Sequence, residues 1–439
     1  MKTYYINAST FCMERMLDCQ KISDYLKING WVPVKKALQA DLIIISTCSF
    51  GKEEDSSSLD YLKYHLKRKR SSAKLVVAGC LSSINPDILK QLGELYFLSP
   101  TNISQLDDII KPKIPFNDVP EPNIIKAKEV KHSVLFKKKL SFQSSINNIF
   151  KKCKLGDSFF KEWLHTISQS IRHLPVVKSH INPYLTCNRN EFFYLRISKG
   201  CLGDCSYCAK KHSTGRLNSK PLNDILAEFR SGLNNGYKKY YLLTEDSGCY
   251  GLDKGNTIIE LLNELFESGK NETFQIAISN FNSRWFIKYY AELEPILIKN
   301  QERILYIQIP IQSASNTILE LMNRHTRIEE LQECLLKLRQ KAPGLKITTD
   351  LIVGFPGESD NDFELTREFI EVIKFDYIDI FAYEKRPNTK AEQLKNHLSQ
   401  EIISKRELIL AKAQNSFNNS SSLFKKLIEI TKENLQRYN

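Results

Sequence analysis

The sequence lacks any stretch of about eighteen consecutive apolar residues, the length that a membrane-spanning helix requires. Its first residues, MKTYYINAST, also lack the apolar core of a signal peptide. These two absences predict a soluble, cytoplasmic protein. Eleven cysteines are scattered along the 439 residues, and this odd number argues against a secreted disulfide framework. In a reducing compartment, such cysteines favour metal ligation or catalysis instead.

Several common catalytic motifs are also missing. The sequence has no HExxH or HxxxH metal-binding pattern, no serine nucleophile elbow and no phosphate-binding loop. Acidic residues are outnumbered, because 50 Asp and Glu stand against 63 Lys and Arg, for a formal net charge of +13. That excess favours a polyanionic partner such as RNA, and the alternative is a lysine-rich surface that is merely solvated.

The first hundred residues alternate short β-rich runs with stretches of helical length. The runs are KTYYI (2–6), DLIIIS (41–46) and KLVVAG (74–79), and helical patterns cover 15–28 and 57–70. Alternating strands and helices predict a parallel sheet that is covered on both faces. We therefore expect a doubly wound α/β domain over residues 1–110, with its chemistry at the carboxyl ends of the strands.

Residues 111–188 differ in composition from this first region. Four prolines interrupt the beginning, and residues 126–154 contain nine lysines but a single acid, Glu129. Residues 158–174 have the pattern of an amphipathic helix. We interpret 111–188 as a linker with a basic insertion that folds only partly on its own.

From residue 191 onward the alternation of strands and helices resumes. Six strand-like runs occur at 191–198, 237–243, 273–279, 304–309, 346–353 and 376–383. Six β/α units in a row predict a partial (β/α)6 barrel, similar to a TIM barrel, over residues 189–395, with active residues at the strand ends. Residues 396–439 have a helical, polar pattern.

Three cysteines lie close together just after the first of these runs, in KGCLGDCSYCAKKHSTGRLNSKP (199–221). Iron–sulfur cubanes are normally held by four thiolates, so Cys201, Cys205 and Cys208 would leave one iron open. An open position is typical of a catalytic metal site rather than a structural one. The alternatives are coincidental cysteines or a zinc site, for which His212 is the only nearby fourth ligand.

Three further cysteines are far apart in the sequence. Cys12, Cys48 and Cys80 each follow an N-terminal strand or lie near its carboxyl end. Each one taken singly is typical of a buried structural residue. A parallel sheet would bring all three together, and the set then indicates a second cluster with three thiolates and one open iron.

The loop at 201–208 resembles the signature of radical SAM enzymes, and the six cysteines together resemble the methylthiotransferases, which modify tRNA adenosines or a ribosomal protein. The resemblance runs from residue 3 to about 395, with a gap over the basic insertion. The matching stretches are GRLNSKP (215–221), LLTEDSGCYGLD (242–253), IPIQSASNTILELMNR (309–324) and TTDLIVGFPGESDNDF (348–363).

This resemblance implies two 4Fe–4S clusters, S-adenosylmethionine (SAM) and an electron donor such as flavodoxin or ferredoxin. Cys201, Cys205 and Cys208 would hold the cluster that cleaves SAM, and Cys12, Cys48 and Cys80 the auxiliary cluster that carries the sulfur. The implied reaction begins when a 5′-deoxyadenosyl radical removes hydrogen from an unactivated C–H bond. Sulfur is then inserted, and a second SAM methylates it.

The resemblance also implies contacts with SAM, at Tyr207, Arg216, Glu245, Gln312, Ser313, Arg324, Ile352 and Gly354. Tyr207, Ile352 and Gly354 are expected near the adenine. Glu245, Gln312 and Ser313 are expected at the methionine part, and the two arginines at its carboxylate. Plain barrel core is the alternative for Ile352, and surface ion pairs are the alternative for the arginines. Glu358 is expected to cap the next helix or to stabilise its turn.

The sequence departs from the family pattern near the first cysteine and near the C-terminus. Arg15 stands where the family has Asn, and Cys19 stands where it has Ser, whereas Asp18 is in register. The family's C-terminal β-barrel, the TRAM domain that helps to bind the substrate, is expected to be missing, because no alternating strands follow Tyr383.

Two substrate classes stay open at this point, and a peptide or protein residue is favoured over a tRNA adenosine. A missing RNA-binding module favours a peptide or protein substrate, with the basic insertion as a replacement surface. The LLTEDSGCYGLD match and the positive charge favour threonylcarbamoyl-adenosine in tRNA instead. The other hypotheses are a radical SAM enzyme with a different reaction and a non-catalytic iron–sulfur protein that binds RNA or acts as a sensor.

Overall fold

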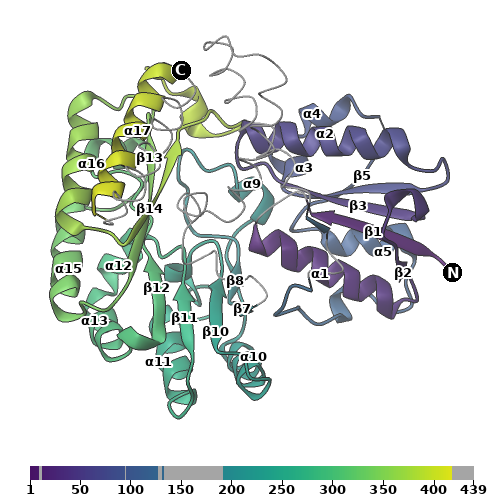
Figure 1. The fold of residues 1–439 in the computed structure, drawn as a ribbon, viewed down its shortest axis with the longest axis horizontal. Coiled ribbons are helices and arrows are strands. Elements are labelled where there is room, and N and C mark those ends of the chain that lie inside the picture. Colours follow the sequence, from purple (N-terminus) through teal and green to yellow (C-terminus); the bar gives the residue numbers. More distant parts are fainter. Residues whose placement is uncertain (9–11, 94, 127–130, 133–190, 418–439) are drawn as a thin grey trace, which may run out of the picture.

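A computed structural model describes residues 1–8, 12–93, 95–126, 131–132 and 191–417. Most of the expected basic insertion, its helix at 158–174 and residues 418–439 lie outside the described residues. Two parallel sheets with helices packed on them form the structure (Figure 1), which confirms the predicted α/β class. In the described part of the chain, no helix is both long and apolar enough to cross a membrane.

The N-terminal sheet has the strand order β2-β1-β3-β4-β5, with β6 paired to β1, and all of these pairs are parallel. Its strands are β1 (Thr3–Ala8), β2 (Val32–Pro33), β3 (Leu42–Thr47), β4 (Lys74–Gly79), β5 (Tyr96–Leu98) and β6 (Lys131–His132). The sequence pattern predicted β1, β3 and β4. It missed β2 and β5 because strands of two or three residues are too short to show a period.

Helices cover both faces of this sheet, as expected for a doubly wound domain. Successive side chains of a strand point to opposite faces, so Ile44 joins one core and its neighbours Ile43 and Ile45 join the other. Helices α1 (Met13–Ile28) and α5 (Leu106–Ile110) lie on one side of the strands, and α2 (Lys52–Arg68), α3 (Leu81–Ile84) and α4 (Asp87–Lys90) lie on the other (Figure 1).

The second sheet has the order β14-β13-β12-β11-β10-β7, and its strands are all parallel. They are β7 (Phe192–Arg196), β10 (Lys239–Leu243), β11 (Gln275–Ile278), β12 (Ile304–Gln308), β13 (Ile347–Val353) and β14 (Tyr377–Ala382). Because no described strand joins β7 to β14, the barrel is partial, as the sequence predicted. A short antiparallel pair, β8 (Ser198–Lys199) and β9 (Asn218–Ser219), follows β7.

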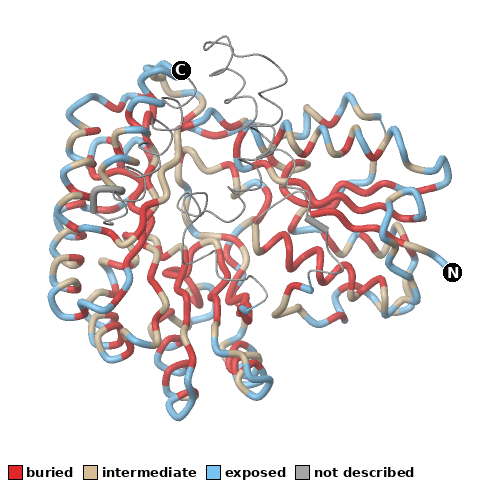
Figure 2. The backbone as a smooth tube through the Cα atoms, viewed as in Figure 1, coloured by how far each residue is buried: buried red, intermediate tan, exposed pale blue. Residues whose placement is uncertain are grey.

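Helices pack on the outer side of this barrel, and Figure 2 shows its strands and the inward sides of its helices as buried. The helices are α10 (Leu222–Asn234), α11 (Ile258–Ser268), α12 (Ser283–Lys288), α13 (Tyr290–Lys299), α14 (Asn316–Leu321), α15 (Ile328–Lys341), α16 (Asp360–Ile373) and α17 (Gln400–Phe417). The carboxyl ends of the strands stay free of this layer and are available for a site.

Helix α1 also contacts the inner face of the barrel. Met16 and Leu17 pack in one buried cluster with the strand residues Tyr194, Tyr241 and Tyr306. Residues 121–126 run beside β7, where Tyr194 N–H donates to the carbonyl oxygen of Asn123 at 2.7 Å. The N-terminal domain is therefore packed directly against the open barrel, with α1 at the boundary.

The described start of the expected linker packs on the N-terminal domain. It contains the 3-10 helix η3 (Phe116–Asp118), and both Phe116 and Val119 are buried against α1 and its sheet. The described start of residues 111–188 therefore belongs to the core of the N-terminal domain. The predicted boundary between that domain and the linker stays a prediction.

Candidate active site at the boundary of the two sheets

The loop after β8 carries three cysteines to one cavity. Cys201, Cys205 and Cys208 line a cavity of about 160 Å³ at the carboxyl end of the barrel. Gly203 lies between two of the thiols: its N–H donates to Cys201 Sγ at 3.0 Å. A Cβ on Gly203 would lie 3.2 Å from Cys201 Sγ and 3.9 Å from Cys205 Sγ. The loop thus brings these thiols together around a residue that has no side chain.

Gly200 allows this loop to fold back on the chain. Its φ is +74°, and a Cβ there would lie 2.1 Å from the carbonyl oxygen of Arg216. A glycine is needed because the left-handed region and the close backbone approach both exclude a side chain. His212, the only candidate for a fourth zinc ligand, is exposed and contacts the carbonyl oxygen of Asn388 at 3.1 Å.

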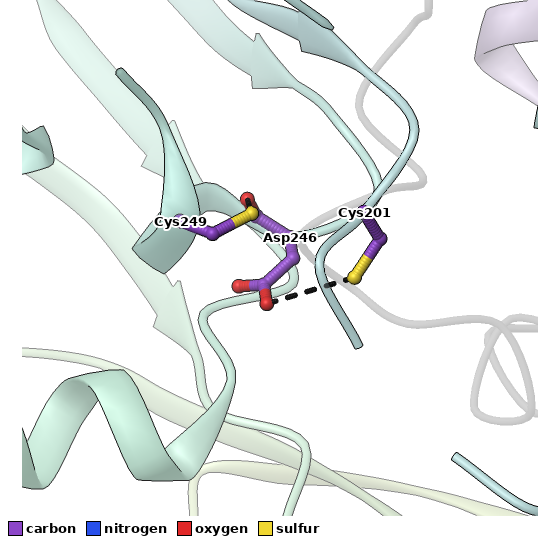
Figure 3. A group of neighbouring side chains, drawn as sticks. All are labelled: Cys201, Asp246 and Cys249. Carbon is purple, nitrogen blue, oxygen red and sulfur yellow. Dashed lines mark hydrogen bonds between the residues drawn. The ribbon is translucent and has the colours of Figure 1, made fainter. Parts of the chain in front are cut away.

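Cys201 has two further neighbours, Asp246 and Cys249, which come from the loop after β10 (Figure 3). Cys201 Sγ lies 3.8 Å from Asp246 Oδ2, and the Cys249 thiol donates to the carbonyl oxygen of Asp246 at 3.2 Å. A hydrogen bond with Cys249 lowers the pKa of Cys201, which favours a thiolate at that position. Sequence reasoning set Cys249 aside, because nothing along the chain marks it as a neighbour of Cys201.

The other three cysteines lie at the carboxyl ends of adjacent strands. Cys48 follows β3 and Cys80 follows β4, and the Cys80 N–H donates to the carbonyl oxygen of Thr47 at 3.2 Å. Cys12 stands at the N-terminus of α1, after β1. One buried cluster contains Cys80, Ile84 and Ala209, the residue after Cys208. The two sets of cysteines therefore approach each other across the domain boundary.

Charged side chains surround this second set. Burial raises the pKa of Cys12 most, and the Glu14 carboxylate raises it further. The Cys80 thiol acts in the same direction. The Arg15 guanidinium pairs with Asp18 at 3.1 Å and lies near both of these thiols. The departure from the family at position 15 therefore places a buried cation beside the thiols of Cys12 and Cys80.

A group of charges, with two buried carboxyl groups around the half-buried Lys210, lies between the two sets of cysteines. Lys210 Nζ lies 3.1 Å from Glu14 Oε2 and 3.7 Å from Glu245 Oε1. Burial and the neighbouring Glu14 raise the pKa of Glu245 to about 7. Burial opposes ionisation of Glu14 as well, but Lys210 and Arg15 outweigh it and lower its pKa to about 2. Near neutral pH this arrangement keeps Glu14 ionised and holds a proton at Glu245 over part of the range.

Four of the predicted SAM contacts line the cavity: Tyr207, Glu245, Gln312 and Arg324. Arg324 is buried, and its guanidinium donates to the carbonyl oxygen of Pro310 at 2.6 Å and to the Tyr207 hydroxyl at 3.3 Å. Its Nη1 lies 3.9 Å from Cys205 Sγ. Glu245 accepts the Gly200 N–H at 2.9 Å, which ties it to the cysteine loop.

The other four predicted contacts lie outside the residues that line the cavity. Arg216 is exposed, and Ser313 is fully buried with its hydroxyl 3.4 Å from that of Thr366. Ile352 packs in a cluster that also contains Tyr207. A Cβ on Gly354 would lie 2.3 Å from Ile403 Cγ1, so that backbone packs on α17. Their role with SAM stays a prediction.

Glu358 holds the turn after β13, which was one of its two expected roles. Its Oε2 accepts the Gly354 N–H at 2.8 Å and pairs with Arg406 of α17. The carboxylate is buried, so the arginine supplies the compensating charge that a buried carboxylate requires.

Sequence reasoning missed several polar residues of the cavity: Lys210, Asp246, Asn282 and Asp350. The available signal was their position, because Asp246 directly follows the predicted Glu245 and Lys210 lies two residues after Cys208. Asp350 lies on β13 and accepts a hydrogen bond from Gln308 Nε2 at 2.8 Å. Burial and the neighbouring Asp379 raise the pKa of Asp350 to about 7.

The donor atoms at the boundary fit iron–sulfur ligation. Each set offers three thiols, and three thiolates can hold three irons of a cubane and leave the fourth open. The cavity beside Cys201, Cys205 and Cys208 adds an arginine and a carboxyl group, which suit the carboxylate and the amino group of an amino acid. These residues therefore fit an amino-acid cofactor next to a cluster.

Two family profiles match the chain. The profile described as "Radical SAM superfamily" matches residues 195–370, and the one described as "Uncharacterized protein family UPF0004" matches residues 5–98. The first covers most of the partial barrel with its cysteine loop. The second covers the N-terminal sheet, including all three of its strand-end cysteines.

Curated relatives span most of the chain at modest identity. The ribosomal protein uS12 methylthiotransferase of Clostridioides difficile is 28% identical over 413 residues, which are 91% of this chain and 79% of that protein. The one from Chlamydia felis is 26% identical over 92% of this chain and 76% of its own length. A probable threonylcarbamoyladenosine tRNA methylthiotransferase of Pyrococcus horikoshii is 25% identical over 88% of this chain and 77% of that protein.

Among solved structures, the radical S-adenosylmethionine methyltransferase TsrM from Kitasatospora setae matches with a TM-score of 0.59 and 10% identity, over 89% of this chain and 75% of that chain. The cobalamin-dependent S-adenosylmethionine radical enzyme OxsB matches with a TM-score of 0.52 and 15% identity, over 92% of this chain and 56% of that chain. At such low identity the likeness shows a shared fold alone.

The partial barrel, its three-cysteine loop and the matching profile together define a radical SAM enzyme. The chain belongs to the radical SAM methylthiotransferase family, which uses SAM and 4Fe–4S clusters.

Proposed function

We propose that this enzyme inserts sulfur into an unactivated C–H bond of a polypeptide side chain and methylates that sulfur. Cys201, Cys205 and Cys208 hold the cluster that cleaves SAM, and Cys12, Cys48 and Cys80 hold the auxiliary cluster. The observation that carries this proposal is that the two sets lie close at the domain boundary, where Cys80 shares one buried cluster with Ala209, the residue after Cys208. A protein with one radical cluster would have no need for a second set of thiols at this place.

When bound, the clusters and SAM supply an electron, a 5′-deoxyadenosyl radical, a sulfur and a methyl group, and a low-potential flavodoxin or ferredoxin is the electron source. The chain's own residues bind and orient these groups. Arg324 faces the cavity beside Cys205 and suits the carboxylate of SAM, while Glu245 suits its amino group. Tyr207 is wedged between Arg324 and Phe355, which is a suitable place for it to pack against an adenine.

The relatives named above support a polypeptide substrate, because those from Clostridioides difficile and Chlamydia felis are named for ribosomal protein uS12. The second candidate is threonylcarbamoyl-adenosine in tRNA. The Pyrococcus horikoshii relative and the net charge of +13 favour it.

Two cysteine variants test the division of labour between the two sets. Cys205→Ala is expected to abolish 5′-deoxyadenosine formation from SAM. Cys48→Ala is expected to keep that cleavage and to lose sulfur insertion, with about half of the roughly eight irons per chain remaining. Cys334→Ala on α15 is the matched control and keeps both activities, since this half-buried thiol lies outside both sets. Full thiolation by Cys48→Ala would contradict the auxiliary site.

The substrate class is tested in the host. The gene is deleted, and digested ribosomal proteins and digested tRNA are compared with those of the parent strain by mass spectrometry. Loss of a methylthio mass from a peptide supports the proposal, and loss from a tRNA nucleoside supports the second candidate instead. A radical SAM enzyme with another reaction would leave both digests unchanged.

A further inference from the structure

A short segment that follows β14 contacts residues next to cysteines of both sets. It runs from Arg386 to Ala391, and we call it the 386–391 segment. At its first residue, the Arg386 guanidinium donates from Nη2 to Ser49 Oγ at 2.7 Å and to the Ser49 carbonyl oxygen at 3.1 Å. The same nitrogen lies 2.8 Å from Asp55 Oδ2. These partners belong to the N-terminal domain, and Ser49 directly follows Cys48.

Asp55 connects this contact to a second cysteine. It accepts the Ser49 hydroxyl, and it accepts Asn85 Nδ2 at 3.0 Å. Asn85 ends helix α3, which begins directly after Cys80. Ser49, Asp55 and Arg386 are all buried, with exposures of 2%, 6% and 5%. Arg386, in the barrel domain, is thus the buried cation that compensates the Asp55 carboxylate. Asp55 in turn links the residue after Cys48 to the end of the helix that follows Cys80.

The far end of the segment holds the other cysteine loop. The Ala391 N–H donates to the carbonyl oxygen of Ser206 at 2.8 Å, and Lys390 Nζ lies 2.6 Å from Asp204 Oδ2. The Asn388 carbonyl oxygen contacts His212 of the short helix α9 (Lys211–Thr214), which follows that loop. Ser206 stands between Cys205 and Cys208, so the segment spans directly from one cysteine set to the other.

The segment is internally braced. The Thr389 hydroxyl donates to the Arg386 carbonyl oxygen at 2.8 Å, and its oxygen accepts the Glu392 N–H at 3.3 Å at the start of a 3-10 turn. Pro387 restricts the backbone between the two contacts. A short braced segment with both ends anchored transmits position from one loop to the other better than a flexible connection would.

We propose that the 386–391 segment sets the distance between the two cysteine sets, and that Arg386 is the positioning residue that holds the Cys48 loop in register with the radical-generating loop. The inference rests on the proposed roles of the six cysteines. The carbon radical must form within reach of the sulfur, and a displacement of about 1 Å can cost about 100-fold in rate. Arg386 therefore affects the coupling of SAM cleavage to sulfur insertion and leaves SAM cleavage itself intact.

The test compares Arg386→Gln with Arg386→Lys and the parent enzyme. In the cluster-free protein, the alkylation rate of each cysteine by iodoacetamide is measured by peptide mass spectrometry. Arg386→Gln is expected to speed up alkylation of Cys48 several-fold relative to Cys201. In the reconstituted enzyme, 5′-deoxyadenosine formation is expected to persist while methylthio product per 5′-deoxyadenosine falls about tenfold or more. Arg386→Lys keeps the charge and recovers part of that ratio.

Arg339→Gln is the matched control, because Arg339 pairs with Asp376 at 2.8 Å inside the barrel domain, away from the boundary. It is expected to leave the product ratio and Cys48 alkylation unchanged. If Arg386→Gln fails to fold, Asp55→Asn weakens the same contact from the other side and replaces it in every assay.

Three outcomes separate the hypotheses. An unchanged Cys48 alkylation rate and product ratio in Arg386→Gln overturns the inference. An equal loss of 5′-deoxyadenosine and product also overturns it, because a general structural defect would cause that. The failure of the proposed function would be recognised by a different result. Cys48→Ala would then form as much methylthio product per 5′-deoxyadenosine as the parent enzyme, whatever the result for Arg386→Gln.

Discussion

At the scale of a residue, Asp350 shows what burial does to one carboxyl group of the cavity. The structure places it beside Asp379 and Gln308, where burial and the neighbouring acid raise its pKa to about 7. The unfolded chain releases the same proton near pH 3.8. Between pH 3.8 and about 7, Asp350 is protonated in the folded state and ionised in the unfolded state. The free energy of unfolding therefore falls as the pH rises through this range, and Asp350 causes no further loss above it.

We therefore expect Asp350→Asn to remove part of this pH dependence. From pH 5 to pH 8, the free energy of unfolding of the parent protein should fall by about 1–2 kcal/mol more than that of the variant. Urea unfolding of the cluster-free protein at both pH values measures the difference. Parallel pH profiles for the two proteins would contradict the raised pKa.

At the scale of an element, the ends of β3 and β4 set the spacing of Cys48 and Cys80. Gly79 ends β4 with a φ of +96°, and a Cβ there would lie 2.3 Å from the carbonyl oxygen of Thr47. The adjacent strands thus approach too closely for any side chain, directly before both cysteines. The geometry of this proposed auxiliary site depends on that one glycine.

Gly79→Ala is expected to lower the free energy of unfolding by about 2–4 kcal/mol, from the left-handed conformation and the clash together. It should also reduce the iron that the N-terminal set retains after reconstitution. Thermal denaturation and iron analysis measure the two effects. Gly30→Ala is the control, because its φ is +80° and nothing lies within 4 Å of the added Cβ, so only about 1–2 kcal/mol should be lost. Equal losses of unfolding free energy in Gly79→Ala and Gly30→Ala would contradict this prediction, because they would show that the backbone shifts to relieve the clash with Thr47.

At the scale of the whole molecule, a buried charged network holds the two domains together. Arg196, at the end of β7, donates to Asp18 Oδ1 and to Glu121 Oε2 at 2.9 Å each, and to the carbonyl oxygen of Glu14 at 2.9 Å. Its side chain is almost fully buried. Loss of one partner from such a pair is costly because the other charge stays buried.

Arg196→Met is expected to lower the free energy of unfolding by about 3 kcal/mol, which is the lower end of the range for a broken buried ion pair. The loss stays at that end because Asp18 is still paired with Arg15, and Glu121 is still paired with Lys21. Calorimetry should then show two separated transitions, one for each domain, in place of cooperative unfolding. Lys270→Met removes an exposed ion pair with Glu267 and should leave the thermogram unchanged. A single shifted transition in Arg196→Met would mean that apolar packing around Met16 and Leu17 suffices to couple the domains.

The sequence predicted those features that have a local pattern. The six barrel strands and β1, β3 and β4 show themselves as apolar runs at regular intervals. The spacing of Cys201, Cys205 and Cys208 exposes the first cysteine set within eight residues. Contacts between distant residues leave no such pattern: Arg386 meets Ser49 across 337 positions, and Lys210 meets Glu14 across 196. Those pairs form only after the two sheets have packed.

Residue types at short spacings and at predicted strand ends were enough to predict the fold class and six candidate thiolates, and the family resemblance implied the chemistry. Only the tertiary structure decided which of the predicted SAM contacts line the cavity, that Cys249 and Asp246 stand beside Cys201, and that Arg386 joins the two cysteine loops. The physical reason is that parallel strands collect distant loops at one edge, and the partners there are selected by packing and by the charge compensation that burial demands.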